Sequence, residues 1–227
     1  MSTVKQTYEE LYTHLKCASV AQIGGFRPPE NKLTSWFGGR GVGKKDETLP
    51  QYKGRNMFAL LQVNVDELPV VPDELKGIAF LIMFINREEY PFDKPHGDGW
   101  EIREYTTLDG LTLLPESNEK SLVKEFPIKW NEVKDDAPDW ENAWELVNLD
   151  PINNTEGADE AFYCDLKRYP NTKFGGYPKC IQHAADLDGF VYQIGSEEKP
   201  NWMWADNGIA YFNKNKSGEW SFDCQFY

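Results

Sequence analysis

The pattern of apolar and polar positions predicts strands along most of this chain. Residues 57–65 and 77–85 are mainly apolar, and the second run is apolar on both faces, which predicts a strand inside a sheet. Shorter runs of the same kind predict further strands at residues 101–108, 126–130, 190–194, 208–212 and 219–227. Because the strands follow one another too closely for a helix between each pair, we predict an α+β, β-rich fold with largely antiparallel sheets.

Helical periodicity is limited to three segments. In residues 3–16 one helical face carries Val4, Tyr8, Leu11, Tyr12 and Leu15. We therefore predict an N-terminal amphipathic helix, and two short helices at residues 139–147 and 158–169. Residues 17–56 are rich in glycine, proline and charge, and we predict loops there.

A short pattern occurs twice at one offset. Gln62, in the run LLQV, and Gln193, in VYQI, are 131 residues apart, and the same separation holds between Gly77 of GIAF and Gly208 of GIAY. Two matches at one offset favour an internal duplication. An amide within an apolar strand needs hydrogen-bond partners, so each glutamine either fixes the turn of its own loop or faces a ligand.

The duplication also sets the domain organisation that we expect. Residues 1–227 form one domain, with related halves at roughly 20–110 and 170–227 joined by residues 111–169. A Gly-Gly pair beside an aromatic residue precedes the pattern in each half. In the second half this is KFGGYP, which contains Tyr177, and its first-half partner is either IGGF or WFGG, a choice that spacing leaves open.

The charge of the chain limits its partners. The sequence has 24 Lys and Arg against 37 Asp and Glu, a formal net charge of −13. This balance argues against non-specific binding to nucleic acid or to an anionic membrane. A basic polypeptide would suit such a surface, and a solvated acidic surface without a partner has the same composition.

Targeting and redox signals favour the cytoplasm. Glu9 and Glu10 stand where a signal peptide needs an apolar stretch, and the longest apolar run, residues 78–85, is too short to cross a bilayer. The cysteines are scattered and form no Cys-x-x-Cys: Cys17, Cys164, Cys180 and Cys224. We expect a cytoplasmic protein with reduced thiols.

Several motifs resemble functional signatures but lack the required context. GGRGVGKK, residues 38–45, ends in lysine where a phosphate-binding loop needs Ser or Thr, and no helix can follow it, so we predict a basic loop. His96 and His183 have no metal-ligand spacing, and Cys180 near His183 is not a catalytic signature. We therefore assign no catalytic residue, metal or cofactor.

The segment NWMWADNG is the most unusual candidate surface. In a strand, Trp202 and Trp204 would share one face, followed by a turn at Asp206 and Asn207. The indoles either cap the core or form an aromatic patch with an acidic rim, to which Trp100 would belong.

Several of these stretches together resemble one known family. They are SWFGG, MFALLQVNVDELP, GDGWEIREY, GGYPKCIQ and VYQIGSEEKPNWMWADNGIAYF. In this order they resemble the YwqG-like family, a bacterial family of unknown function, which implies a β-rich single domain with internal duplication and favours WFGG as the partner of KFGGYP. That family is distantly similar to programmed cell death 2 proteins, which act as chaperones for a ribosomal protein, and some relatives have been proposed as toxin-immunity proteins. The Cys-x-x-Cys of several relatives is absent from LPQYKGRNM, residues 49–57, so no metal is implied here.

We therefore expect a non-enzymatic protein that binds a basic polypeptide client or a toxin in a groove between its two halves. The alternative is a small-ligand-binding protein or enzyme whose site lies between the halves, around Gln62, Gln193, His183 and Asp206.

Overall fold

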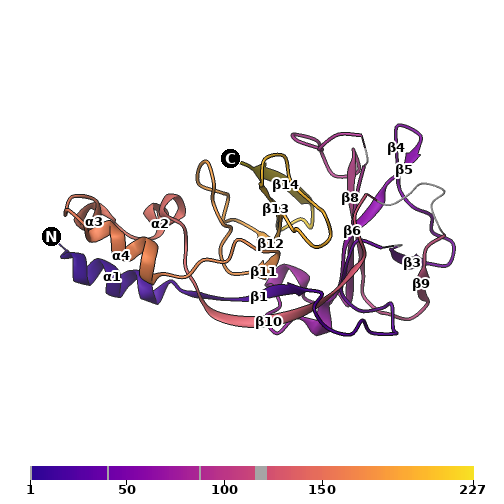
Figure 1. The fold of residues 1–227 in the computed structure, drawn as a ribbon, viewed down its shortest axis with the longest axis horizontal. Helices are drawn as coiled ribbons and strands as arrows, with labels where there is room; N and C mark the ends of the chain where they lie inside the picture. The colour runs from indigo at the N-terminus through magenta and orange to yellow at the C-terminus, as the bar shows by residue number, and fades with distance from the viewer. Residues whose placement is uncertain (1, 40, 87, 116–121) are drawn as a thin grey trace.

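The computed structural model describes residues 2–39, 41–86, 88–115 and 122–227. Its main feature is one ten-stranded antiparallel sheet, in the order β14-β13-β12-β11-β1-β10-β2-β6-β7-β8 (Figure 1). The bounds of these strands are β1 Lys16–Ile23, β2 Trp36–Phe37, β6 Phe58–Asn64, β7 Phe80–Ile85, β8 Trp100–Tyr105, β10 Phe126–Asp136, β11 Lys173–Gly175, β12 Phe190–Gly195, β13 Ile209–Lys214 and β14 Trp220–Gln225. Four short strands make two small ladders beside it: β3 Val42–Lys44 with β9 Leu111–Leu113, and β4 Gln51–Tyr52 with β5 Arg55–Asn56.

The helices gather at one end of the molecule, away from the sheet (Figure 1). They are α1 Val4–Thr13, α2 Trp140–Leu146, α3 Asp150–Asn153 and α4 Ala158–Asp165, and two single 3-10 turns occur at Val65–Glu67 and Asp73–Leu75. Thr3 and Gln6 form a capping box that starts α1, and Leu11 on its apolar face is fully buried. Leu11 packs with Phe162 of α4 and Ala143 of α2 in a separate small core. Within the described part of the chain, no helix is long and apolar enough to cross a membrane.

The sheet has the same arrangement on both sides of its centre. β1 and β10 pair at the centre, with Gln22 opposite Lys129. β2 then lies against β10, and β11 lies against β1, so each short aromatic-Gly-Gly strand pairs with the long strand of the other half. Next come β6, β7 and β8 on one side and β12, β13 and β14 on the other, which leaves β8 and β14 as the two edges.

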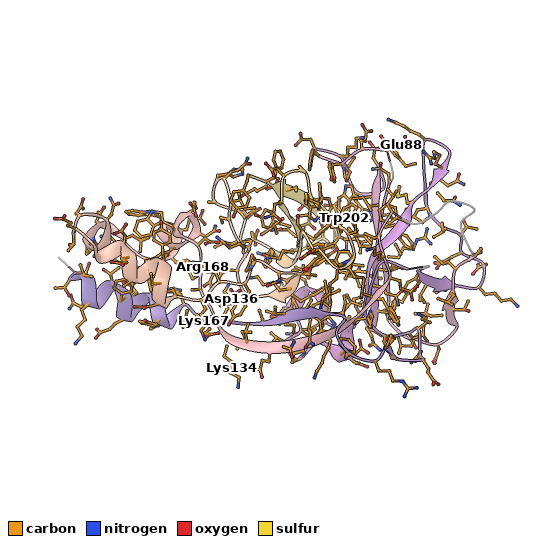
Figure 2. All side chains as sticks on the ribbon, viewed as in Figure 1. Glu88, Lys134, Asp136, Lys167, Arg168 and Trp202 are labelled. Atoms are coloured by element: carbon orange, nitrogen blue, oxygen red, sulfur yellow. The ribbon has the colours of Figure 1, made fainter. Side chains whose placement is uncertain are left out.

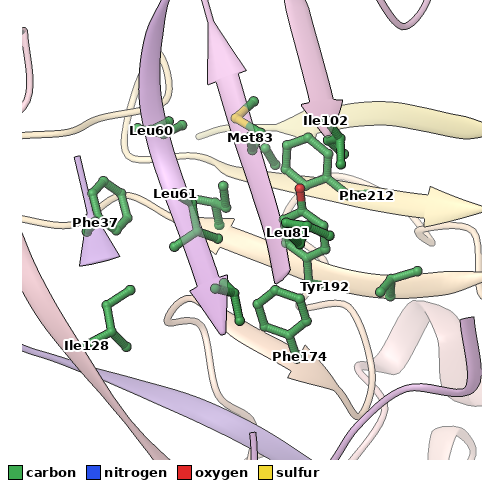
Figure 3. Close-up of a cluster of buried hydrophobic side chains, with 14 of the residues drawn as sticks. Phe37, Leu60, Leu61, Leu81, Met83, Ile102, Ile128, Phe174, Tyr192 and Phe212 are labelled. Atoms are coloured by element: carbon green, nitrogen blue, oxygen red, sulfur yellow. The ribbon is translucent and has the colours of Figure 1, made fainter. Parts of the chain in front are cut away.

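The two halves of the sheet face one another across the main core. Figure 3 shows Leu61, Leu81 and Met83 from β6 and β7 meeting Phe174 and Tyr192 from β11 and β12. These side chains are all fully buried. A second core lies on the outer face of β7, where Phe80, Ile82 and Phe84 are covered by residues of β3, β4 and β9. Because β7 is covered on both faces, its apolar run is continuous.

The β-rich, largely antiparallel fold with an N-terminal helix is confirmed, and so are the strands predicted from apolar runs. The prediction of loops over residues 17–56 is wrong, because β1 to β5 lie in or at the edges of this segment. The basic loop predicted for GGRGVGKK contains strand β3, and its Arg40 lies outside the described residues. The helix at 158–169 ends earlier than predicted, at Asp165.

The structure also defines how far the repeated pattern extends. WFGG and KFGG occupy corresponding places, since Phe37 pairs with Leu61 and Phe174 with Tyr192. The next strands do not keep the 131-residue offset. Gln62 lies opposite Ile82, so an offset of 131 would place Asn213 opposite Gln193. The residue found opposite Gln193 is Tyr211, two positions earlier.

Candidate functional site

The two edge strands present main-chain groups that the sheet does not use. Gly99, which directly precedes β8, and Tyr105, its last residue, accept hydrogen bonds on the β7 side from the amides of Asn86 and Ala79 (both 2.8 Å). Main-chain groups alternate along an antiparallel strand, so those of Trp100, Ile102 and Glu104 point away from the sheet. The side chains of Trp100 and Ile102 point into the main core.

The same reasoning applies to β14. The Asn215 amide donates to the Glu219 carbonyl oxygen (3.0 Å). The main-chain N–H and C=O groups of the odd-numbered residues of β14 therefore point toward β13. Those of Trp220, Phe222 and Cys224 therefore point away from the sheet. The Cys224 amide donates to the carboxylate of Asp223 (2.8 Å). No other described residue hydrogen-bonds the outward main chain of Trp220 or Phe222, so this stretch of edge is open.

By contrast, the loop before β8 covers the outer side of that strand. The Gly97 amide donates to the Trp100 carbonyl oxygen (2.8 Å), and the Ile102 amide donates to Nε2 of His96 (2.8 Å). The His96 ring also lies edge-on to the Trp100 indole, with 5.1 Å between ring centroids. His96 thus takes the place of a neighbouring strand at Ile102, and it is exposed on its other side.

A groove of about 1070 Å³ separates the two edges. Lys94, His96 and Trp100 line one wall, and Trp220 and Phe222 line the other. The Lys214 ammonium of β13 forms an ion pair with Glu104, which also lines the groove (2.7 Å). A groove of this size can hold an extended segment of polypeptide.

A second, smaller pocket of about 240 Å³ continues along β14. It is lined by Phe92, Asp93, Phe222, Cys224 and Phe226, among others. The Phe92 ring stacks on Phe222 and Phe226, with centroid distances of 6.5 and 5.8 Å. Since Asp93 and Phe222 border both cavities, the open edge of β14 runs past the two of them.

The carboxylates near β14 give this edge a negative rim. Glu219 and Asp223 are exposed and have no ion-pair partner among the described residues. Hydrogen bonds from Asn215 and Ser217 hold the pKa of Glu219 below its ordinary range. Glu219 therefore stays ionised at neutral pH.

The two glutamines of the repeated pattern support their own loops. The amide of Gln62 donates to the carbonyl oxygens of Lys32 and Thr34, at 2.8 and 2.9 Å. The amide of Gln193 donates in the same way to Tyr169 and Asn171, at 3.1 and 2.9 Å. Each glutamine therefore fixes the loop before its own Gly-Gly strand, which is the first of the two roles considered from the sequence.

The two tryptophans of NWMWADNG belong to an aromatic cluster beside the groove. Trp204 is fully buried and packs edge-on against Trp202, with 4.9 Å between centroids. Trp202 is half-buried and contacts Tyr90 (6.3 Å), and Figure 2 places it over the β half of the molecule. Trp204 and Trp100 both contact the Phe222 ring, at 5.6 and 5.7 Å, so all three indoles belong to one continuous cluster.

The other candidate residues lie apart from the groove. Asp206 and Asn207 are exposed in a turn, and Asn207 has φ of 51°. Tyr177 is buried, and its hydroxyl donates to the carbonyl oxygen of His14 (2.7 Å). His183 is exposed. The side-chain amides of Gln62 and Gln193 are engaged with their own loops, and no described hydrogen bond or ion pair joins either of them to His183 or Asp206.

A buried ion pair joins the start of β11 to the end of β10. The Lys173 ammonium lies 2.6 Å from the carboxylate of Asp136, and both side chains are almost fully buried. The Tyr177 amide donates to the same carboxylate oxygen (2.9 Å), while the other oxygen has no partner in the described structure. Burial raises the pKa of Asp136 in spite of the Lys173 cation, and burial lowers the pKa of Lys173. Figure 2 shows Asp136 at the end of β10, between the helices and the main part of the sheet.

The possible metal ligands and the thiols of the described residues are scattered over the fold. Over the described ranges, no three His, Cys, Asp or Glu residues are grouped to hold a metal ion. Burial raises the pKa of both Cys180 and Cys224 to about 12, so these thiols are unreactive at neutral pH. Cys17 and Cys164 are exposed and free.

Sequence reasoning missed the residues that define the groove. The sequence indicates only that Trp220 and Phe222 belong to a strand and that His96 is an isolated metal-ligand type. Their roles depend on which strands are edges, which apolar runs do not show. The loop YPFDKPH before β8, with two aromatic rings and two prolines, is the one local signal of an unusual connection.

A comparison with protein-family models gives one match. A model described as a domain of unknown function (DUF1963) matches residues 35–218. The chain belongs to this family. The match covers most of the DUF1963 protein, from the residue before β2 to the turn between β13 and β14. Among curated proteins, none matches this chain.

Proposed function

We propose that this DUF1963 protein binds an extended segment of another polypeptide in the groove between β8 and β14, and that it does so without catalysis. The observation that carries the proposal is the groove itself, which is about 1070 Å³ in volume and is bordered by both edges of one sheet. Exposed sheet edges and adjoining pockets are a common means of holding peptides. The Trp100, Trp220 and Phe222 side chains give the walls aromatic surface.

The charge of the protein supports a basic client. The net charge is −13, and the rim residues Glu219 and Asp223 lie beside the groove. Opposite charge raises the rate of encounter between protein and client and disfavours acidic competitors. The YwqG-like resemblance agrees with this role. It points to a bacterial family that is distantly similar to chaperones of the programmed cell death 2 type, and some relatives have been proposed as toxin-immunity proteins. In both roles the client is a polypeptide.

We further infer that the two halves arose by duplication. The mirrored strand order and the matched hydrogen bonds of Gln62 and Gln193 support this inference. Under this arrangement β8 and β14 are related strands, with Trp100 and Trp220 at corresponding first positions. The groove then lies where the two related edges meet, which agrees with a client site shared by both halves.

Site-specific photo-crosslinking tests the proposal. A photoreactive amino acid replaces Ser221, an exposed residue of the groove, and in a matched control it replaces Lys134, an exposed residue of β10. On irradiation in native lysate, the Ser221 variant should form one dominant protein adduct, which mass spectrometry identifies. If Ser221 gives no more adduct than Lys134, the groove is not a client site.

A further inference from the structure

We infer that the client, on the proposed binding function, adds to the sheet as an antiparallel strand along β14 and is basic at every second residue. The step beyond the proposed function is the mode of binding and the chemistry of the bound segment. Three features of the edge strands support this mode: their unequal protection, the two cavities along β14, and the carboxylates on its outer face.

Of the two edges, only β14 is free to accept a strand at its centre. On β8 the outward groups of Trp100 and Ile102 already bond Gly97 and His96. On β14 the outward amide and carbonyl groups of Trp220 and Phe222 have no such partner in the part of the chain that the structure describes. An antiparallel strand opposite either residue would form a pair of main-chain hydrogen bonds with it. Every strand pairing in the large sheet is antiparallel, which favours the same direction for an added strand.

Side chains on the inner face of the added strand would be apolar. A residue directly opposite another in a sheet points to the same face. Client residues opposite Trp220 and Phe222 therefore point toward the two cavities. The smaller cavity is walled by the rings of Phe92, Phe222 and Phe226, which suit an aliphatic or aromatic side chain.

Side chains on the outer face of the added strand would be basic. The outward-facing positions of β14 are Ser221 and Asp223, both exposed, and Glu219 stands just before the strand. A Lys or Arg opposite Asp223 forms a favourable cross-strand pair, whereas an acidic residue there is repelled. The client segment is thus expected to alternate basic and apolar residues.

The same carboxylates argue against a second copy of this chain as the occupant. Two β14 edges could pair about a two-fold axis, as edge strands often do. Such pairing would bring the Glu219 and Asp223 carboxylates of one copy close to those of the other, on chains with a net charge of −13 each. A basic partner removes this repulsion, and so we assign the edge to a client and not to a dimer.

The test uses short synthetic peptides as probes. The parent probe is a fluorescein-labelled peptide that alternates Lys with Val or Phe, and its binding to the full chain is followed by fluorescence anisotropy. A matched peptide with Glu in place of Lys should bind at least about tenfold more weakly. Two further peptides carry N-methyl groups on alternate amides, one on the odd set and one on the even set. A strand presents only one of these sets to its neighbour, so one methylated peptide should lose binding and the other should keep it.

Protein-side measurements locate the added strand. Peptide binding should slow hydrogen exchange of the Trp220 and Phe222 amides at least about tenfold, and leave the Ile102 amide unchanged because His96 already holds it. Asp223→Lys should weaken binding about tenfold, while Glu132→Lys, at an exposed site on β10, should leave binding unchanged.

Each outcome separates the two proposals. If both methylated peptides bind like the parent and the Ser221 crosslink still forms, the groove binds polypeptide but not by strand addition. If the parent probe shows no binding up to about 1 mM, or if sedimentation shows a dimer that Asp223→Lys strengthens, the basic-strand inference is overturned. Failure of the Ser221 crosslink removes the proposed function itself.

Discussion

Removing the cation of the buried ion pair should destabilise the protein in a strongly pH-dependent way. Lys173→Met keeps most of the side-chain volume but leaves the Asp136 carboxylate with the Tyr177 amide as its one remaining hydrogen-bond donor in the described structure. Breaking a buried pair from one side costs about 3–5 kcal/mol of unfolding free energy. Because Lys173 and Asp136 are 1% and 0% exposed, this pair belongs at the upper part of that range near pH 8.

The pH dependence follows from the proton count. In the parent protein the Lys173 cation acts against the burial that raises the pKa of Asp136, and so it favours the ionised carboxylate. In Lys173→Met, the native Asp136 pKa rises further, since burial already raises it and the Lys173 charge that lowers it is gone. A carboxyl with a raised native pKa gives stability at low pH that is lost as pH rises through that pKa. The loss caused by Lys173→Met should therefore shrink on acidification, by up to about 1.4 kcal/mol per pH unit below the native pKa.

Urea unfolding at pH 5, 6, 7 and 8 measures this effect for the parent and the variant. Two controls are available. Lys167→Met removes the cation from the neighbouring, exposed Asp135 pair, and should cost less than about 1 kcal/mol at every pH. The double variant Lys173→Met/Asp136→Asn removes both charges and should lose the pH dependence. The reasoning would be refuted if Lys173→Met lost as little unfolding free energy as Lys167→Met, or lost the same amount at all four pH values. Either result would mean that Asp136 is not a desolvated carboxylate in the variant.

Three further predictions concern stability and are measured by urea unfolding. Gly176→Ala places a methyl group 2.0 Å from the buried Asp136 carboxylate. It should therefore cost at least about 2 kcal/mol more unfolding free energy than Gly54→Ala, where φ is also positive but nothing lies within 4 Å. Equal losses of stability in the two variants would contradict the close approach. Gln193→Leu leaves three main-chain groups without their amide partner and should cost about 2–4 kcal/mol, whereas a change under 1 kcal/mol would mean that the amide does not hold its loop. Trp204→Ala should cost about 3–5 kcal/mol and Trp202→Ala less, since only Trp204 is fully buried; the reverse order would show that Trp204 is not core.

Long apolar runs explain most of what the sequence predicts correctly. β6 and β7 are found at the predicted places because burial on two faces leaves a continuous apolar signal. β1 is missed because KCASVAQI has small and polar residues, and its strand form depends on pairing with both β10 and β11. β2 is only two residues long, too short to give any period.

The candidate site was less accessible from sequence than the fold. The sequence indicates an aromatic group at Trp202 and Trp204, but whether they face the core or solvent depends on Tyr90, which contacts both rings from a distant part of the chain. His96 gives no local sign that it caps Ile102. Edge strands are a property of the whole sheet, and so the groove required the complete topology.

The crossed pairing at the centre of the sheet constrains how this protein can be made on the ribosome. β1 is synthesised well before its partners β10 and β11, which begin only at Phe126 and Lys173. The emerging N-terminal half can pair β2, β6, β7 and β8, but β1 waits with both of its sides unpaired until most of the chain has left the exit tunnel. Such distant pairing slows folding and prolongs exposure to wrong partners. The nascent chain is therefore expected to depend on protection during translation, and its folding yield should fall when elongation pauses before Phe126.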